Sequence, residues 1–224
     1  MNIKPWSYLL AASFAVGSIL SCNKNNSDLV EIPATPGKVA FYNLIPNSSA
    51  INMYVNGTRQ NSNRIDYEYS SGYMSIAQGQ QLISFKYDDT RNDVFTPGVN
   101  INIPAGNTTI FVAGKSASDL IYSRDTAVVD TLSYKPKFRF INASSDSPAY
   151  DVSINKVSIT KQAYKSVSAF NRVDTGKVTL KVNVSGTSTS LLSTQITLQA
   201  STIYTMYLYG SYKGSGLTYN LRVN

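Results

Sequence analysis

Residues 137–155 read KFRFINASSDSPAYDVSIN, and residues 38–56, which lie 99 positions earlier, read KVAFYNLIPNSSAINMYVN. Each sequence contains an alternating run, an Asn, a polar turn cluster with Ser and Pro, and a second alternating run. Side chains of a β-strand point alternately to the two faces of a sheet, so this period of two predicts strands with one buried face. Each copy therefore predicts two strands joined by a turn-rich loop.

The similarity between the two copies continues along the chain. The matched apolar runs are residues 83–87 with 180–184, 99–103 with 194–198, and 110–112 with 206–208. Each copy then has about seven short strands separated by turn signals, which is typical of an antiparallel sandwich. The crossover helices that a parallel α/β sheet requires are missing from the pattern. We therefore predict an all-β protein with two tandem antiparallel β-sandwich domains of the immunoglobulin-like kind.

The repeat divides the chain into four parts. Residues 1–21 are expected to be a signal peptide, which is excluded from the fold. Residues 22–37 are polar and contain two prolines, so we expect a flexible tether. The first β-sandwich repeat is predicted at residues 38–136 and the second at residues 137–224.

The N-terminal segment resembles the signal peptide of a bacterial lipoprotein. Lys4 supplies a positive charge, and residues 8–20 form an apolar run that is too short for a comfortable membrane span. Ser21 then precedes Cys22, and an aliphatic residue followed by a small residue and Cys resembles a lipobox. We expect an acylated Cys22 to tether the chain to the bacterial outer membrane, surface-exposed or facing the periplasm. The alternative is an ordinary secretory signal with an incidental cysteine.

The composition argues against several kinds of site. The 224 residues include no His, which is the commonest general base and transition-metal ligand. Cys22 is the only cysteine, which excludes an intrachain disulfide and a cysteine-based zinc cluster. The net charge of +7 comes from scattered Lys and Arg residues, whereas nucleic-acid binding requires a clustered basic stripe. We predict no cofactor, no metal and no nucleic-acid partner.

The segment FINASSDSPAYDV resembles the signature of a bacterial family, the domain of unknown function 4397. The signature N-A-S-x-D-x-P-x-x-D-V is matched by Asn142, Ala143, Ser144, Asp146, Pro148, Asp151 and Val152. The first copy keeps Asn43 but has Asn47, Ser49 and Asn52 in place of Asp, Pro and Asp. The resemblance covers most of residues 38–210 and implies β-sandwiches in tandem on a Bacteroidetes-type lipoprotein. It brings no established catalytic or ligand-binding residues.

Two carboxylates of this signature are candidate metal ligands. Asp146 and Asp151 flank a short loop and could supply oxygen atoms to calcium. The structural alternative, which we favour, is that they cap turns through hydrogen bonds from side chain to backbone. A second group, Asp88, Asp89 and Asp93, lacks the spacing of a known calcium loop and is expected at a solvated hairpin tip.

Tyrosines form two groups that are candidate binding surfaces. The first group is Tyr67, Tyr69 and Tyr73, and the second is Tyr204, Tyr207, Tyr209, Tyr212 and Tyr219. An exposed aromatic row can stack on sugar rings or anchor a protein partner. The alternative, which we favour, is that these tyrosines serve half-buried strand surfaces, where the ring packs and the hydroxyl reaches water.

The sequence contains neither a G-x-S-x-G nucleophile elbow nor a Gly-rich phosphate loop. We predict that the protein is not an enzyme but a non-catalytic binding or structural module of the cell envelope. Its partners would be the membrane, through the lipid anchor, and an envelope or extracellular glycan or protein. One alternative is a glycan-binding surface lipoprotein that uses exposed tyrosines. Another is a carbohydrate-active hydrolase with paired carboxylates, because a sequence does not place acidic residues in space.

Overall fold

The computed structural model describes residues 35–214 and 216–224. The predicted signal peptide, Cys22 and most of the tether lie outside the described residues. The strands of the first repeat are β1 (Gly37–Asn43), β2 (Ile51–Val55), β3 (Thr58–Arg59), β4 (Met74–Ile76), β5 (Gly79–Tyr87), β6 (Val99–Ile103), β7 (Asn107–Val112) and β8 (Leu120–Arg124). A short 3₁₀ helix, η1 (Ala117–Asp119), precedes β8. No helix in the described part of the chain is long and apolar enough to cross a membrane.

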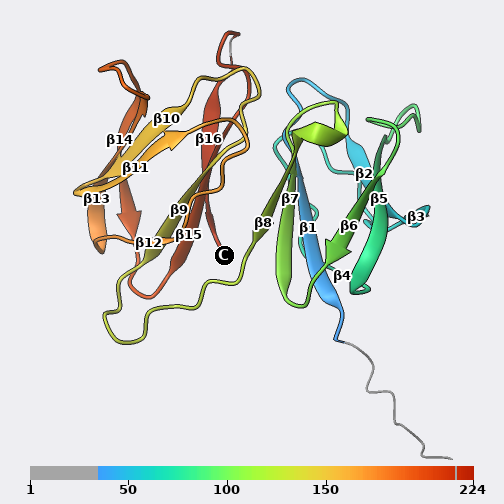
Figure 1. Cartoon of the computed structure of the whole chain (residues 1–224), viewed down its shortest axis with the longest axis horizontal. Helices are drawn as coiled ribbons and strands as arrows, with labels where there is room; N and C mark the ends of the chain where they lie inside the picture. The colour runs from blue at the N-terminus through green and yellow to red at the C-terminus, as the bar shows by residue number, and fades with distance from the viewer. Residues whose placement is uncertain (1–34, 215) are drawn as a thin grey trace, which may run out of the picture. The chain divides into compact units, whose positions relative to one another are not determined.

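The second repeat follows the same order of elements. Its strands are β9 (Lys137–Asn142), β10 (Tyr150–Ile154), β11 (Val157–Gln162), β12 (Asn171–Arg172), β13 (Gly176–Val184), β14 (Ser190–Leu198), β15 (Ile203–Tyr209) and β16 (Thr218–Val223). Each repeat is a sandwich of two four-stranded sheets (Figure 1). The strand orders are β4-β1-β7-β8 and β3-β2-β5-β6 in the first, and β12-β9-β15-β16 and β11-β10-β13-β14 in the second. The prediction of an all-β protein with two β-sandwiches is confirmed.

One pairing in each sandwich departs from the predicted antiparallel pattern. β1 pairs with β7 in parallel, with Lys38 beside Asn107, and β9 pairs with β15 in parallel, with Lys137 beside Ile203. The remaining ladders between the described strands are antiparallel. Parallel strands cannot be joined by a hairpin, and here most of the repeat separates the two partners. The alternating pattern of a strand does not reveal this, because it is the same for both kinds of partner.

Each sandwich has its own apolar core, and the period of two in the sequence accounts for it. In the first repeat, Val39 and Phe41 of β1 share a core with Ile83 and Phe85 of β5, and all four are fully buried. The rings of Phe41 and Phe85 meet edge to face with their centroids 5.2 Å apart. A separate core in the second repeat includes Phe140 of β9. Burial of these alternate side chains is the main force that holds each pair of sheets together.

A third apolar cluster contains side chains from both repeats, and we call it the interface cluster. Its buried members are Leu44, Phe111, Ala113, Ile121, Ile141, Ala143, Tyr207 and Tyr209. In β15, Met206 and Leu208 lie in the core of the second repeat, whereas Tyr207 and Tyr209 lie in the interface cluster. Strand β15 is therefore buried on both faces. The two repeats therefore pack against each other and form one compact unit.

Equivalent contacts align the two repeats. The hydroxyl of Ser71 accepts a hydrogen bond from the N–H of Phe41 in β1, and the hydroxyl of Ser168 accepts one from β9. Asn56 and Asn155 both begin tight turns after the second strand, with φ of 49° and 50°. Between these landmarks the first repeat is two residues longer than the second. This difference changes the shape of one edge of the first sandwich.

Candidate functional site

The buried Asn of the shared motif holds the loop between the first two strands of each repeat. Asn142 Nδ2 donates to Ser147 Oγ at 3.0 Å and to the carbonyl of Gln162 at 3.1 Å. Its Oδ1 accepts a hydrogen bond from the N–H of Ser144 at 3.1 Å. Asn43 makes a comparable set of hydrogen bonds in the first repeat. Both side chains are fully buried, so this part of the motif shapes the loop and presents no group to solvent.

Asp146 binds the loop that follows β15. Its carboxylate accepts hydrogen bonds from Ser211 Oγ at 2.6 Å, from the N–H of Tyr212 at 2.7 Å and from the N–H of Lys213 at 3.0 Å. Burial by itself raises the pKa of Asp146, but these donors outweigh it and lower the pKa to about 2. The carboxylate therefore caps the loop that follows β15, and it also accepts a hydrogen bond from Ser144 Oγ of its own loop at 3.3 Å.

Asp151 caps two further segments. It accepts hydrogen bonds from the N–H of Lys161 at 2.8 Å and from Ser185 Oγ at 2.9 Å, and the first of these contacts is the main cause of its lowered pKa. The first repeat exchanges donor and acceptor at the equivalent place, where Asn52 Nδ2 donates to Asp88 Oδ1 at 2.9 Å. The Asn that replaces Asp in the first repeat thus keeps the same connection. These bonds support the capping interpretation of the motif.

The other acidic group lies in and beside the hairpin between β5 and β6. Asp88 bonds to Asn52, Asp89 accepts a hydrogen bond from Ser49 Oγ at 2.8 Å, and Asp93 lies 3.4 Å from Lys86 Nζ. Among the residues that the structure describes, no group of three or more His, Cys, Asp or Glu side chains is placed to hold a metal ion. Each of these carboxylates contacts a side chain of the same protein chain.

The structure separates the tyrosines into buried and exposed sets. Tyr204, Tyr207 and Tyr209 are buried, which contradicts an exposed binding row at these three positions and agrees with the favoured packing role, although the burial is deeper than half. They are buried because β15 packs against apolar side chains on both faces, and burial raises the pKa of Tyr209 to about 12. In the first repeat, Tyr69 and Tyr73 are 68% and 41% exposed. Tyr67, Tyr212 and Tyr219 are half-buried, so the most exposed rings of the two groups lie in the first repeat.

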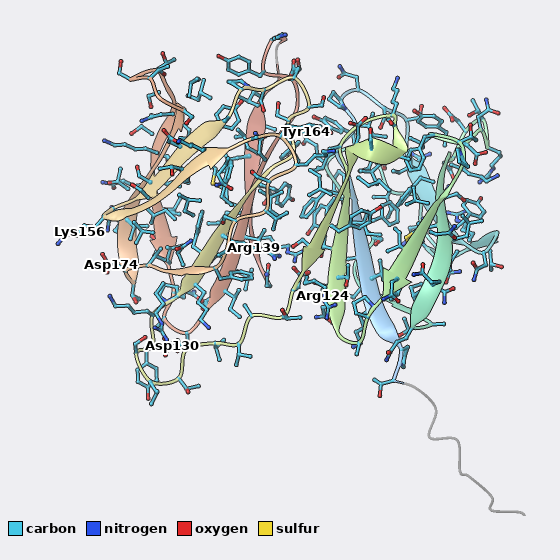
Figure 2. The ribbon with its side chains drawn as sticks, viewed as in Figure 1. Arg124, Asp130, Arg139, Lys156, Tyr164 and Asp174 are labelled. Atoms are coloured by element: carbon cyan, nitrogen blue, oxygen red, sulfur yellow. The ribbon has the colours of Figure 1, made fainter. Side chains whose placement is uncertain are left out.

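A buried ionic cluster joins the repeats beside the interface cluster. Arg139 of β9, labelled in Figure 2, pairs with Asp125. The other carboxylate oxygen of Asp125 lies 2.8 Å from Arg222 Nη2. Burial raises the pKa of Asp125, but Arg222, Thr109, Tyr73 and Arg139 together hold it below its ordinary value. Because these ionised groups pair with one another across the two repeats, we assign the cluster to the contact between the repeats.

The first repeat has a hollow of about 380 Å³ at the edge of its sandwich, and we call it the first-repeat groove. Residues 60–66, residues 69–71 and Met74 line it. These residues belong to the segment that crosses from the end of β3 to the start of β4, and so from one sheet to the other. The groove therefore lies where the two sheets of the first sandwich are bridged.

The groove exists because β3 stops early. In the second repeat β11 runs to Gln162, but in the first repeat β3 ends at Arg59 and the side chain of Asn61 replaces the ladder. Asn61 Oδ1 accepts a hydrogen bond from the N–H of Met53, and Asn61 Nδ2 donates to Asn52 Oδ1, each at 2.8 Å. The chain returns to β2 at Ile65, which exchanges two backbone hydrogen bonds with Ile51. Residues 62–64, between these two points, are exposed.

The exposed side chains of the groove are polar, with one aromatic ring. Asn63, Arg64, Asp66 and Tyr69 are all exposed, and Arg64 Nε lies 3.5 Å from Asp66 Oδ1. An amide, a guanidinium and a carboxylate can bind hydroxyl groups, while the ring offers a flat apolar face. Of the residues that line the groove, the sequence pattern indicated only Tyr69 as a candidate for binding. The available signal was the polar run 60–64 together with the two extra residues.

The strand order, the motif contacts and the tandem arrangement can be compared with known families. The family described as "Domain of unknown function (DUF4397)" matches residues 37–133 and again residues 136–221. The chain belongs to this family. Its two DUF4397 copies correspond to the two sandwiches, and the prediction of a tandem pair is confirmed. The motif around Asn142 thus lies in the loop between the first two strands of a DUF4397 domain.

Other comparisons add little to the DUF4397 assignment. No match is found among curated proteins. One similar solved structure is that of a "putative cell adhesion protein" from Bacteroides uniformis, which is 11% identical. The similarity covers 84% of this chain and 99% of that chain, with a TM-score of 0.19. A TM-score of this size supports no argument about function.

Proposed function

We propose that the protein is a non-catalytic binding module of the bacterial cell envelope, tethered to the outer membrane through an acylated Cys22. The observation that carries the binding role is the first-repeat groove, whose lining includes exposed polar groups and Tyr69. The lipobox-like sequence before Cys22 supports the anchor. Two DUF4397 sandwiches in tandem agree with a module of this kind.

Glycan is the ligand class that the chemistry of the groove favours. Sugars present many hydroxyl groups, which amide, guanidinium and carboxylate side chains bind, and an apolar ring face, which tyrosine can cover. Of the described residues that line the groove, Asp66 is the only carboxylate. Glycosidases generally use a pair of carboxylates, so the groove suits binding better than hydrolysis.

The groove is tested by binding to a panel of envelope and extracellular polysaccharides. We expect residues 23–224, which retain every described strand, to bind at least one of them and Tyr69→Ala to weaken that binding about tenfold. Tyr134→Ala is the matched control, because Tyr134 is 64% exposed and lies outside the groove. Equal loss in both variants would contradict a site in the groove. Release of sugar products from the panel would favour the hydrolase instead.

The anchor is tested in cells with Cys22→Ser. We expect the wild-type protein to incorporate labelled fatty acid and to sediment with the outer membrane, and the variant to lose the label. Labelling of the variant would contradict acylation at Cys22.

The side of the membrane is tested with protease on intact cells, with a periplasmic protein as the control. Loss of the protein while the control survives would place it on the cell surface and favour adhesion or nutrient capture. Protection until the outer membrane is opened would place it in the periplasm and favour a structural or assembly role.

A further inference from the structure

The segment between β8 and β9 exposes an unusual amount of apolar surface. Leu132 is 93% exposed, Val128 is 71% exposed and Tyr134 is 64% exposed, and Val129 is exposed as well. We call residues 127–134 the apolar loop. Single apolar residues on a surface are common, but several on one short connection indicate a contact surface.

The apolar loop is held in a defined shape. Asp130 Oδ1 accepts hydrogen bonds from the N–H of Leu132 at 3.1 Å and of Ser133 at 2.9 Å, and its other oxygen pairs with Arg172. Figure 2 shows Asp130 in this connection between β8 and β9. At the C-terminal end of the loop, the carbonyl of Tyr134 accepts a hydrogen bond from the N–H of Ser201 at 2.8 Å. These contacts fix the backbone of the loop. The loop therefore loses little conformational freedom when its exposed side chains bind a partner surface.

Three cationic side chains contact or adjoin the apolar loop, namely Lys135, Lys137 and Arg172. Lys137 Nζ donates to the carbonyl of Val128 at 2.6 Å, and Lys135 follows the loop directly. The nearby carboxylates are already engaged, since Asp130 pairs with Arg172 and Asp174 lies 3.4 Å from Lys135 Nζ. Aliphatic and tyrosine side chains beside Lys and Arg are typical of protein surfaces that contact the headgroup region of a bilayer.

The apolar loop begins near one end of the first sandwich, and β1 begins at the same end. The N–H of Lys38, at the start of β1, donates to the carbonyl of Gly106, and the N–H of Asp125 donates to the carbonyl of the adjacent Asn107. Arg139, near the start of β9, pairs with the same Asp125. The entry of the chain and both ends of the connection therefore lie close together.

The length of chain before the first sandwich is compatible with contact at the membrane. Cys22 precedes the first described residue, Thr35, by 13 positions. Fully extended, these residues span at most about 45 Å, and any shorter arrangement brings this end of the protein nearer to the bilayer. An anchor at Cys22 would thus hold the apolar loop within reach of the lipid surface.

We infer that the apolar loop is a second membrane contact, in which Leu132, Val128 and Tyr134 enter the headgroup region of the bilayer. Lys135 and Lys137 then face the phosphates of anionic lipids. This inference rests on the proposed anchor at Cys22. One lipid chain alone binds a membrane reversibly, and a second contact beside it would strengthen attachment and orient both sandwiches.

The inference is tested with a label in the intact lipoprotein. Acylation blocks the only native cysteine, so Leu132→Cys supplies a single thiol for an environment-sensitive fluorophore. Ser188→Cys is the matched control, because it is exposed in the hairpin between β13 and β14, which lies beside Tyr150 at the other end of the sandwich. The acylated proteins are reconstituted into phosphatidylethanolamine and phosphatidylglycerol vesicles that contain brominated lipid, and acylation is verified by mass spectrometry.

We expect brominated lipid to quench the label at position 132 about twofold or more and to leave the label at position 188 unchanged. Equal fluorescence at the two positions in acylated protein would overturn the inference and leave the anchor intact. A blue shift of the label at position 132 that grows with protein concentration without vesicles would assign the loop to a second copy, and would also overturn it.

A second measurement separates the loop from the anchor. Residues 23–224 without lipid should bind the same vesicles, and the double variant Leu132→Ser with Tyr134→Ser should bind about tenfold or more weakly. Leu82→Ser, which changes an exposed apolar residue of β5 outside both the apolar loop and the first-repeat groove, should bind as the parent does. If Cys22 proves not to be acylated, the proposed anchor fails, and this measurement alone decides the inference. Equal binding by all three proteins would overturn it.

Discussion

Asp125 of the first repeat forms an ion pair with Arg139 of the second, and their side chains are only 2% and 3% exposed. The other two nitrogens of the guanidinium also donate, Arg139 Nε to Thr205 Oγ1 at 2.8 Å and Nη1 to the carbonyl of Arg124 at 2.9 Å. Arg222 neutralises the other carboxylate oxygen. A single carboxylate thus pairs with both the buried Arg139 and the largely buried Arg222 at the contact between the repeats.

Replacing this carboxylate should destabilise the protein strongly. In Asp125→Asn two buried guanidinium groups lose their counter-charge, which typically costs about 3–5 kcal/mol of the free energy of unfolding. Urea denaturation measures the loss. Asp174→Asn is the control, because its pair with Lys135 is exposed and should cost less than about 1 kcal/mol. Equal effects of the two substitutions would show that the buried pair does not hold the repeats together.

The same carboxylate should contribute to acid sensitivity. The folded-state pKa of Asp125 is lowered, so the unfolded state binds its proton more readily. The stabilisation is therefore fully present above the ordinary value of 3.8 and is lost as the pH falls through the folded-state pKa. The melting temperature of the wild type should fall more steeply below about pH 4 than that of Asp125→Asn. Parallel curves for the two proteins would argue against this assignment.

The aromatic contact between the repeats gives a third prediction. The ring of Tyr207 lies 5.2 Å from the rings of Tyr42 and Phe111, measured between centroids, and the side chain is buried. Tyr207→Ala should reduce the free energy of unfolding by about 3–5 kcal/mol, because it opens a cavity in the interface cluster. Tyr207→Phe keeps the ring and should cost much less. A small effect of Tyr207→Ala in thermal unfolding would mean that the repeats do not depend on this contact.

Gly210 is a fourth test, because it follows the last residue of β15 with a φ of +89°. A Cβ atom at this position would lie 2.1 Å from the carbonyl oxygen of Gly216, so Gly210→Ala must displace the backbone as well as strain it. We expect a loss of about 2 kcal/mol or more in urea denaturation. Gly186→Ala is the control, since Gly186 has a φ of +74° but no atom within 4 Å of its Cβ position. The prediction fails if the two variants unfold alike.

Much of the fold could be predicted because alternation is a local property. Val39, Phe41, Ile83 and Phe85 follow a period of two, and all four are buried in the first core. The Asn-rich turns and the motif at Asn142 mark the same loops in both repeats. The first-repeat groove was harder to predict from the sequence. It depends on hydrogen bonds from Asn61 to residues of β2, and no local pattern indicates these contacts.

The sequence by itself therefore determined the strands, the turns and the tandem repeat of this protein. Tertiary structure alone decided which strands are buried on both faces. In β15, Tyr207 and Leu208 read as the two sides of an ordinary strand, yet both are buried because the other repeat covers the second side. Alternation states which side chains share a face, but burial of that face depends on a partner surface that is distant in sequence. Asp125 with Arg139, and Tyr207 with Phe111, arise only when the two sandwiches meet.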